Sequence, residues 1–171
     1  SYGDWIVKNP QGKPGGWAFE FDNSFYPDID DTAVVAMALQ DVQLPNEALK
    51  QGAIARAARW IATMQSKTGG WAAFDIDNDQ LWLNDIPYGD LRAMVDPSTA
   101  DITARVLEMH GLLSRDPTLA QRYTSELTPL KLSNGLRYLL KEQEPDGRWF
   151  GRWGVNYIYG TSGAMSAIAL V

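Results

Sequence analysis

The sequence is short of the residues on which most metal and nucleophilic chemistry depends. It has no cysteine and a single histidine, His110, among 171 residues. The absence of cysteine excludes disulfides, zinc–thiolate sites and a cysteine nucleophile, and one histidine argues against histidine-rich metal sites and a Ser-His-Asp triad. A formal charge of −6 argues against nucleic acid as a partner. Carboxylates and aromatic rings, among them seven tryptophans, must therefore carry any chemistry.

Charge is also absent from the last part of the chain, residues 154–171. A membrane-spanning helix needs about 20 mostly apolar residues, and this run is interrupted by polar residues and glycines. The pattern predicts instead a buried helix that stops before its cap. We therefore expect the chain to be a fragment of a longer one.

Apolar periodicity predicts helices and no strand. The segment 30–44 is apolar on nearly every side after an acidic start, which is typical of a helix covered all round. A later segment repeats apolar residues at one helical spacing, at Ile102, Val106, Met109 and Leu113. The expected helices span residues 30–44, 47–65, 98–113 and 132–143, with a further one from about residue 160. The predicted fold class is all-α, with well-buried helices alternating with more polar ones.

Between these helices lies a long segment, residues 66–97, without helical periodicity. Loops of this length are uncommon in compact domains and are usually functional or disordered. This one contains Trp71, Phe74, Trp82 and Tyr88. So many aromatic residues argue against disorder, and we expect the segment to pack as an ordered cover.

Two segments of the chain share one pattern. RAxxWIxxxQ at 56–65 is followed by GGW at 69–71, and NGxxYLxxxQ at 134–143 is followed by GRW at 147–149. PGGW at 14–17 matches the tail of a third copy. Glutamine at a helix end can bond free carbonyls, glycine lets the chain turn, and tryptophan can stack back on the amide. Each copy is thus expected to tie one helix to the next loop, unless the match is a coincidence of composition.

These patterns resemble the QW repeats of triterpene cyclases. DIDDTA at 28–33 matches the DxDDTA motif of that family, and GRWGVNYIYGT at 151–161 matches a further signature. The resemblance is to bacterial squalene–hopene cyclases and covers essentially the whole chain. It implies part of an (α/α)6 toroid, with residues 1–171 a fragment of the catalytic C-terminal domain and the remaining repeats and a second barrel domain absent. The fragment alone is expected to be inactive, because its cavity would be open.

The resemblance also implies an activity and partners. It implies an isomerase that cyclises squalene, or a related polyprenoid, to hopene or hopanol in triterpenoid biosynthesis, with no cofactor and no metal. It further implies monotopic attachment of the full-length enzyme to the cytoplasmic side of the bacterial inner membrane, and it is compatible with a homodimer.

Three aspartates at the start of the first long helix, Asp28, Asp30 and Asp31, have two interpretations. Acidic residues before an apolar run cap a helix and suit its macrodipole. Three in four positions exceed what a cap needs, and in an apolar cavity their repulsion should keep at least one protonated near neutral pH. Such an acid can donate a proton if a cation or hydrogen bonds stabilise the carboxylate left behind. The resemblance assigns the donor to Asp30, with Asp28 and Asp31 as hydrogen-bonding supports.

The candidate cation is Arg105. It follows Asp101 by four residues, so an ordinary intrahelical ion pair is the alternative. The segment DITARVLE at 101–108 resembles the family block that carries a histidine partner of the acid, and Arg105 stands at the histidine position. Because arginine cannot exchange protons, we expect it to stabilise the ionised acid while reprotonation uses water near Tyr159. His110 lies about 140° further round the helix and is expected to be packed or capping.

Aromatic residues are the candidates for stabilising a cation. A protonated polyene would be trapped by water, so the site must exclude water and offer ring faces. Core packing is the alternative for any single ring. By resemblance the substrate-binding positions are Phe19, Tyr26, Phe74, Tyr88 and Trp153, with Trp153 and Tyr159 near the acid. Phe74 stands where better-known relatives have tyrosine, and the missing hydroxyl bears on product distribution.

Other site classes are less well supported by the residues. DIDND at 75–79 fails the calcium-loop template, because Gln80 and Ile86 stand where glycine and glutamate are required, and a turn is expected. A glycoside hydrolase on an α-toroid and a non-catalytic α-toroid binding module remain alternatives. The hydrolase would need two carboxylates about 5 to 9.5 Å apart across an open groove, whereas a cyclase needs one acidic cluster in an enclosed apolar cavity.

Overall fold

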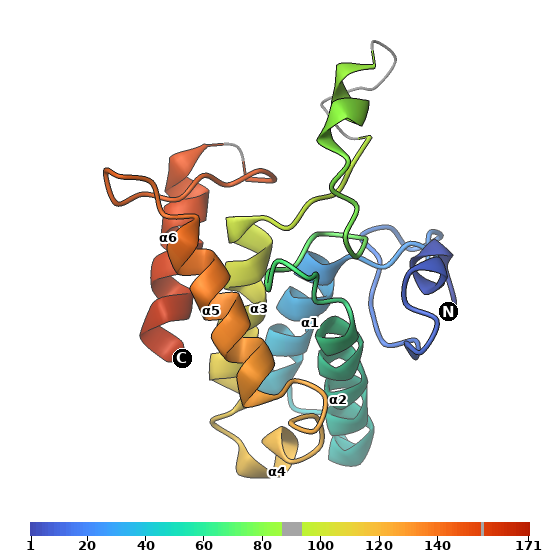
Figure 1. Ribbon diagram of the computed structural model, residues 1–171. Coiled ribbons are helices and arrows are strands. Elements are labelled where there is room, and N and C mark those ends of the chain that lie inside the picture. Colours follow the sequence, from blue (N-terminus) through green and yellow to red (C-terminus); the bar gives the residue numbers. More distant parts are fainter. Residues whose placement is uncertain (87–93, 155) are drawn as a thin grey trace.

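Helices make up the regular structure of this chain (Figure 1). The computed structural model describes residues 1–86, 94–154 and 156–171. Within these ranges the only β-type pairing consists of isolated backbone bridges, so the prediction of an all-α protein is confirmed. In chain order the elements are η1 (Asp4–Val7), α1 (Ile29–Asp41), α2 (Glu47–Thr63), η2 (Leu81–Asp85), α3 (Ala100–Leu113), α4 (Pro117–Ala120), α5 (Pro129–Lys141) and α6 (Tyr157–Leu170), where η denotes a 3-10 helix.

Capping side chains fix where several helices begin. Asp28 precedes α1 and its Oδ1 accepts the backbone N–H of Asp31 at 2.9 Å. Asn46 caps α2 in the same way. Thr128 caps α5, whose first residue is a proline that needs no partner for an N–H group. The carboxylate of Asp28 thus serves the helix that also carries Asp30, which places both at one end of α1.

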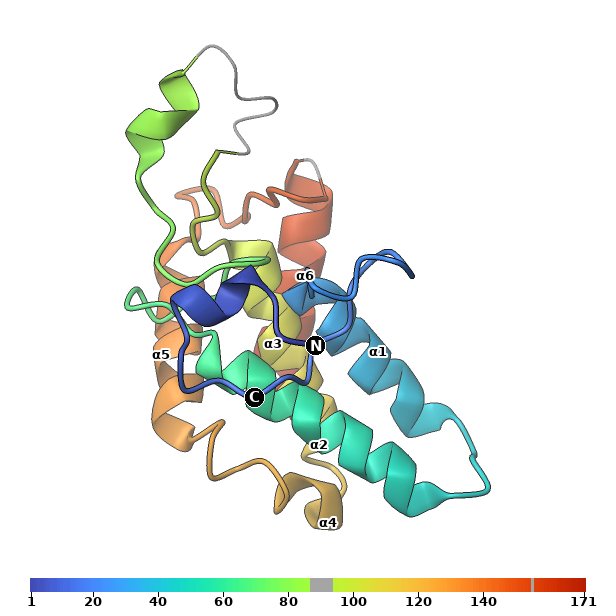
Figure 2. The same ribbon diagram turned by 90° about the vertical axis from the view of Figure 1, so that its right-hand side faces the viewer.

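The long helices form two layers. In the first layer α3 lies between α1 and α6 and packs against both. In the second layer α2 packs on α1, and α5 packs on α3. Figures 1 and 2 show these layers from two directions, with the start of α1 and the start of α3 at the same end of the bundle. Side chains at the starts of the first-layer helices are therefore brought close together.

The predicted helices agree with the observed ones to within three residues at each end. The single turn α4 was not predicted, because four residues are too few to show a period. The expectation that the first long helix is covered on every side is wrong. Val34 and Ala38 of α1 are exposed along a groove between α1 and α3, so one side of this helix has no covering element in the described residues.

Alanine and glycine allow α3 and α6 to approach closely. Ala104 of α3 and Ala164 and Ala167 of α6 are fully buried in the core between them. A Cβ atom added to Gly111 would lie 2.6 Å from the Cβ of Leu170, closer than two side chains can come. The contact between the end of α3 and the end of α6 therefore depends on the absence of a side chain at Gly111.

The uncharged last helix is only half buried, which corrects the expectation of a buried helix. Gly160, Ala164 and Ala167 face α3, whereas the side chain of Ile158 is 89% exposed and Met165 also faces outwards. Among the described residues, no helix combines the length and apolarity needed to cross a bilayer.

The long segment between α2 and α3 packs on the helices over only part of its length, so the expectation of an ordered cover holds for its first part alone. Its first part is anchored in the core by Trp71, which is fully buried. The part that contains η2 projects away from the helices in both views (Figures 1 and 2), and Trp82 is exposed there. Within the 75–79 run, Asp77 accepts the backbone N–H of Lys67 at 2.8 Å, and Asp75 accepts the amide of Asn78. The second bond closes a four-residue bend, and the first ties the run to the loop that follows α2.

The two repeated segments fold alike. The indole N–H of Trp71 donates to the carbonyl of Ile61 in the last turn of α2, at 2.8 Å. The indole N–H of Trp149 donates to the carbonyl of Leu139 in the last turn of α5, at 2.7 Å. Each copy therefore ties a helix end to the following loop, as predicted, and does so through a bond from the ring nitrogen that the pattern alone did not indicate.

The glutamines of the two copies differ in their number of partners. Gln65 donates to the carbonyl of Gly69 at 2.6 Å, and Gln143 donates to that of Gly147 at 2.8 Å. Both glycines have φ near +90°, a conformation that disfavours other residues. Gln65 also donates to the carbonyl of Lys131 in the first turn of α5, at 2.8 Å. The first copy thus joins α2 to the next helix of the same layer.

Candidate active site

The acidic cluster lies at the start of α1. Asp28 is the cap of this helix, and burial raises its pKa from an ordinary value near 3.8 to about 7, with the charges of Asp31 and Asp30 adding to the effect and backbone hydrogen bonds opposing it. Burial, followed by the charge of Asp30, also raises the pKa of Asp31. The cluster therefore retains a proton near neutral pH, chiefly because it is desolvated and secondarily because like charges are crowded.

Asp30 faces a cation and a phenol from two neighbouring helices. Nε of Arg105 on α3 donates to Oδ1 of Asp30 at 2.8 Å. Nη2 of Arg105 donates to the hydroxyl of Tyr159 on α6 at 3.0 Å, and that hydroxyl donates to Oδ2 of Asp30 at 3.3 Å. Three residues from α1, α3 and α6 thus close a triangle of hydrogen bonds around one carboxylate.

The electrostatics of this triangle fix the charge states of Arg105 and Tyr159. Burial acts to lower the pKa of Arg105, but the hydrogen bond and charge of Asp30 outweigh it and raise that pKa above its usual value. Burial raises the pKa of Tyr159, with the nearby Arg105 opposing the shift and Asp30 adding to it. Arg105 therefore remains a fixed cation, and Tyr159 remains a neutral hydrogen-bond donor beside Asp30.

Asp101 is not the partner of Arg105, which corrects the alternative of an ordinary pair between them. Its side chain is buried, at 4% exposure, and its Oδ2 accepts the backbone N–H of Trp153 at 2.8 Å. The intrahelical partner of Arg105 is Glu108, whose Oε2 accepts from Nη1 at 2.8 Å. Spacing alone indicates neither role, because acids three and four residues from Arg105 can both pair with it on a helix and because the contact of Asp101 spans 52 residues.

A common register places one polar residue of each first-layer helix at an equivalent position. Near the start of each first-layer helix a threonine Oγ1 accepts the backbone N–H of a repeat tryptophan. The pairs are Trp17 with Thr32 at 2.8 Å, Trp71 with Thr103 at 3.0 Å, and Trp149 with Thr161 at 3.0 Å. Two residues before these threonines stand Asp30, Asp101 and Tyr159. An alignment of the three repeats on their tryptophans and threonines would have grouped Asp30, Asp101 and Tyr159 from the sequence.

Three of the predicted aromatic residues form one cluster. The rings of Tyr26 and Phe74 lie 5.0 Å apart, and Trp153 meets Phe74 edge-on at 5.8 Å. Phe19 is not part of it in the structure, because its side chain is 83% exposed and it has no ring contact among the described residues. Tyr88 lies outside the described residues.

A buried carboxylate that the sequence interpretation missed holds Phe74 in place. Oδ2 of Asp96 accepts the backbone N–H groups of Phe74 at 2.6 Å and of Asp75 at 2.9 Å, and Oδ1 accepts that of Ala73 at 3.3 Å. Burial raises the pKa of Asp96 although these bonds and the charge of Arg152 act to lower it. No local pattern marks Asp96, since its partners lie more than 20 residues earlier.

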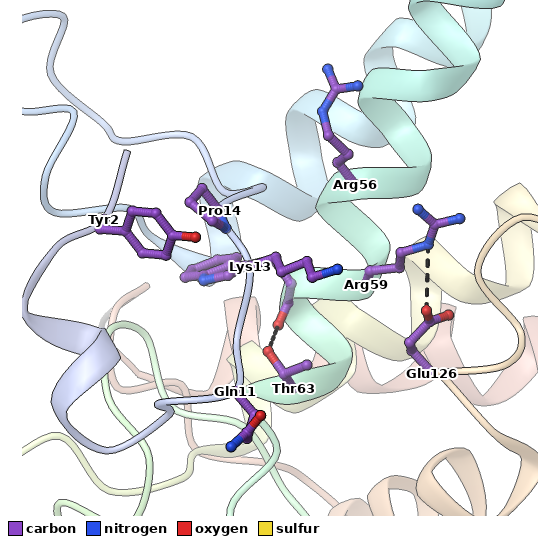
Figure 3. A pocket seen from close by; sticks show the side chains of 9 residues that line it. Tyr2, Gln11, Lys13, Pro14, Arg56, Arg59, Thr63 and Glu126 are labelled. Atoms are coloured by element: carbon purple, nitrogen blue, oxygen red, sulfur yellow. Dashed lines mark hydrogen bonds and ion pairs between the residues drawn. The ribbon is translucent and has the colours of Figure 1, made fainter.

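Two hollows lie near these elements. A groove of about 710 Å³ between α1 and α3 is lined by Val34, Met37, Ala38, Gln40, Asp41, Arg105, Glu108, Leu112 and Arg115. A separate pocket of about 480 Å³ beside α2, shown in Figure 3, is lined by residues such as Lys13, Arg56 and Arg59 and contains none of the predicted site residues. The groove is thus the hollow that Arg105 reaches.

The remaining titratable candidates do not form a second centre. His110 packs edge-on against Tyr123 with ring centres 6.1 Å apart, and burial lowers its pKa, as expected of a packed histidine. Within the described ranges, no three histidine, cysteine or acidic side chains are grouped as a metal ion would require.

Together, Asp30 with its partner Arg105, the neutral phenol of Tyr159 and the rings of Tyr26, Phe74 and Trp153 form the candidate site of this all-α chain. The whole chain, residues 1–171, matches the family described as squalene-hopene cyclase C-terminal domain. The chain belongs to this family.

Three curated relatives illustrate the match. A dammaradiene synthase of Dryopteris crassirhizoma is 58% identical over 153 residues, which cover 90% of this chain and 22% of the relative. A squalene-hopene cyclase of Schizosaccharomyces japonicus is 50% identical, covering 96% of this chain and 23% of the relative. The squalene–hopene cyclase of Alicyclobacillus acidocaldarius is 47% identical, covering 99% and 25%. The chain thus spans about a quarter of the length of these relatives.

Proposed function

We propose that the protein to which this chain belongs cyclises squalene, or a related polyprenoid, by protonating a terminal alkene. The observation that carries the proposal is the triangle of Asp30, Arg105 and Tyr159. An alkene is a very weak base, so its acid must be strong at the moment of transfer, and a fixed cation in contact with the carboxylate provides that strength. Membership of the squalene-hopene cyclase family supports the same chemistry.

The reaction begins at Asp30. Its carboxyl proton moves to the terminal alkene carbon, the alkene electron pair forms the new C–H bond, and a tertiary cation remains on the neighbouring carbon. Each following alkene then attacks the cation and closes a ring. Loss of a proton from the last cation gives hopene, and capture of water gives hopanol, so the reaction without water capture is an isomerisation.

The residues around Asp30 have separate roles. Arg105 stabilises the carboxylate left after transfer, and because it cannot exchange a proton, the proton returns from water by way of the Tyr159 hydroxyl. Asp28 and Asp31 support the cluster, and the raised pKa of Asp28 keeps a proton within it at neutral pH. The rings of Tyr26, Phe74 and Trp153 offer faces that attract a cation and contain no strong nucleophile.

The test is product analysis with the full-length parent. Squalene is incubated with the parent and with its Asp30→Asn variant, and the products are separated by gas chromatography. We expect turnover by the parent and a loss of about 10³-fold or more in the variant, since both the proton and its driving force are removed. Asp146→Asn, which alters an exposed acid paired with Arg148, is the matched control and should retain activity. Unchanged product formation by Asp30→Asn would contradict the proposal.

The same chromatogram identifies the product. One relative is named a dammaradiene synthase and others squalene–hopene cyclases. We propose hopene and hopanol, and dammaradiene as the main product would contradict that part alone. The contact of Asp30 with Arg105 favours an acid whose carboxylate is stabilised by a cation over the glycoside hydrolase and the binding module.

We also propose that the full-length enzyme attaches to one face of the bacterial inner membrane on its cytoplasmic side, because its substrate is insoluble in water. Fractionation of cells that produce the parent tests this. The protein should sediment with membranes, resist washing with salt and be released by detergent. Recovery in the soluble fraction at all salt concentrations would contradict it.

A further inference from the structure

All three nitrogen atoms of the Arg105 guanidinium have a partner, and each partner lies in a different direction. Nε meets Asp30 of α1 at 2.8 Å, and Nη2 meets Tyr159 of α6 at 3.0 Å. Nη1 meets Glu108, one turn further along α3, also at 2.8 Å. The first two contacts belong to the acid site, whereas Glu108, among the described residues, is bonded to Arg105 and to neither Asp30 nor Tyr159.

Glu108 is well placed to fix the orientation of Arg105. A guanidinium is a rigid planar fork, so holding one nitrogen determines where the other two point. An arginine side chain has many rotamers, and a partner that holds one nitrogen reduces the entropy lost when the other two form their bonds. Glu108 is three residues from Arg105 on one helix, and its side chain is only 18% exposed, so the restraint comes from a rigid, partly desolvated element.

The negative charge of Glu108 also affects how Arg105 is oriented towards Asp30. Arg105 is shared between two carboxylates, one from α1 and one from its own helix. A guanidinium without Glu108 is free to rotate towards the groove between α1 and α3, which both residues line. Asp30 and Tyr159 then lose the geometry in which a single cation contacts both.

We propose that Glu108 is a positioning residue of the acid site, which by holding Nη1 of Arg105 directs Nε onto Asp30 and Nη2 onto Tyr159. The inference rests on the proposed function, since it assigns Glu108 a part in the protonation by Asp30. Glu108 is needed because position 105 is an arginine. A histidine at that position is shorter and lacks the third nitrogen, so it cannot be held by Glu108 while it contacts Asp30.

The experiment measures squalene turnover by four full-length proteins: the parent, Glu108→Ala, Arg105→His, and the double variant. We expect Glu108→Ala to lower kcat by roughly 10-fold with KM nearly unchanged, since a misplacement of about 1 Å can cost up to ~10²-fold. In the Arg105→His background the same change should alter kcat less than about 2-fold, because the positioned group is absent. Glu108→Gln retains an acceptor for Nη1 and should recover most of the activity of the parent.

Two controls separate the possible failures. Glu126→Ala removes an acid that pairs with Arg59 away from the site, at 3.6 Å, and should leave kcat unchanged. If Asp30→Asn keeps full activity, the proposed function fails, whatever Glu108 does. If Asp30→Asn is inactive but Glu108→Ala lowers kcat equally in both backgrounds, or has no effect with Arg105 present, the positioning role is overturned and the proposed function stands.

Discussion

Asp30 and Asp101 occupy the same place in successive repeats, two residues before a threonine that binds a repeat tryptophan. Their surroundings are opposite. Asp30 is 29% exposed and is paired with Arg105, whereas Asp101 is buried and binds the backbone of Trp153. The two aspartates therefore share a position in the repeat, and their neighbours decide whether the side chain pairs with a cation or binds a backbone N–H group.

The largest effect is expected from replacing Arg105, the cationic partner that Asp30 has and that Asp101 lacks among the described residues. Arg105→Ala leaves Asp30 and Glu108 without their shared cation, so the ionised acid loses its stabilisation. We expect product formation by the full-length enzyme to fall by about 10²–10³-fold, the usual effect of losing one preorganised electrostatic contact. Initial rates of squalene consumption measure this. A loss of activity of less than 3-fold would show that Asp30 does not depend on Arg105, and the contrast with Asp101 would then need another cause.

The second prediction concerns Asp28, whose pKa is raised by burial. Its folded pKa of about 7 lies above its ordinary value near 3.8, so the folded state binds a proton that the unfolded state has released. The stabilisation from this proton is complete below pH 4 and is lost as the pH rises towards 7.

Asp28→Asn should flatten this dependence, which is worth on the order of a few kcal/mol over the interval, because asparagine still caps α1 but does not titrate. Thermal unfolding of the full-length protein between pH 4 and pH 8 is the measurement. Equal slopes in the parent and the variant would show that Asp28 does not hold the proton.

The third prediction concerns stability, for which Asp101 is expected to matter more than Asp30. Asp101→Ala leaves the backbone N–H of Trp153 without its acceptor, and we expect a loss of stability of about 1–3 kcal/mol. Asp30→Ala removes a partly exposed pair and should cost less than about 1 kcal/mol, although it abolishes turnover. Urea denaturation of both variants gives the comparison. A more stable Asp101→Ala protein than Asp30→Ala protein would invert the assignment of anchor and acid.

The smallest effects are expected in the two glutamine contacts. Gln65 is partly buried and has two acceptors, whereas Gln143 is exposed and has one among the described residues. Gln65→Ala should therefore cost about 1–2 kcal/mol and Gln143→Ala about 0.5 kcal/mol or less. Thermal unfolding distinguishes them, and a larger loss for Gln143→Ala would mean that its exposed bond is not its only contact in the whole protein.

Local patterns were sufficient for much of the fold. The helices followed from apolar spacing and the repeat from its Gln and Trp residues, because both depend on neighbours within about ten positions. Asp30 and Arg105 were brought together by their family resemblance and lie in contact in the structure. The roles of these residues in catalysis remain predictions.

The rest depended on contacts between distant segments. Asp96 binds backbone groups more than 20 residues earlier, and Asp101 binds a group 52 residues later. Whether Phe19 or Ile158 is exposed depends on which surface packs on it, and neither has a covering element among the described residues. Residue type and spacing carry no information about such partners.

The close contact at Gly111 has a consequence for the opposite end of α6. Tyr159 stands 11 residues before Leu170, which is roughly 16 Å along a helix axis. A Cβ at Gly111 would collide with Leu170, so α6 would have to shift to accommodate it. Because a helix transmits such a shift along its axis, we expect Gly111→Ala to displace the Tyr159 hydroxyl from Arg105 although the substitution lies far from both.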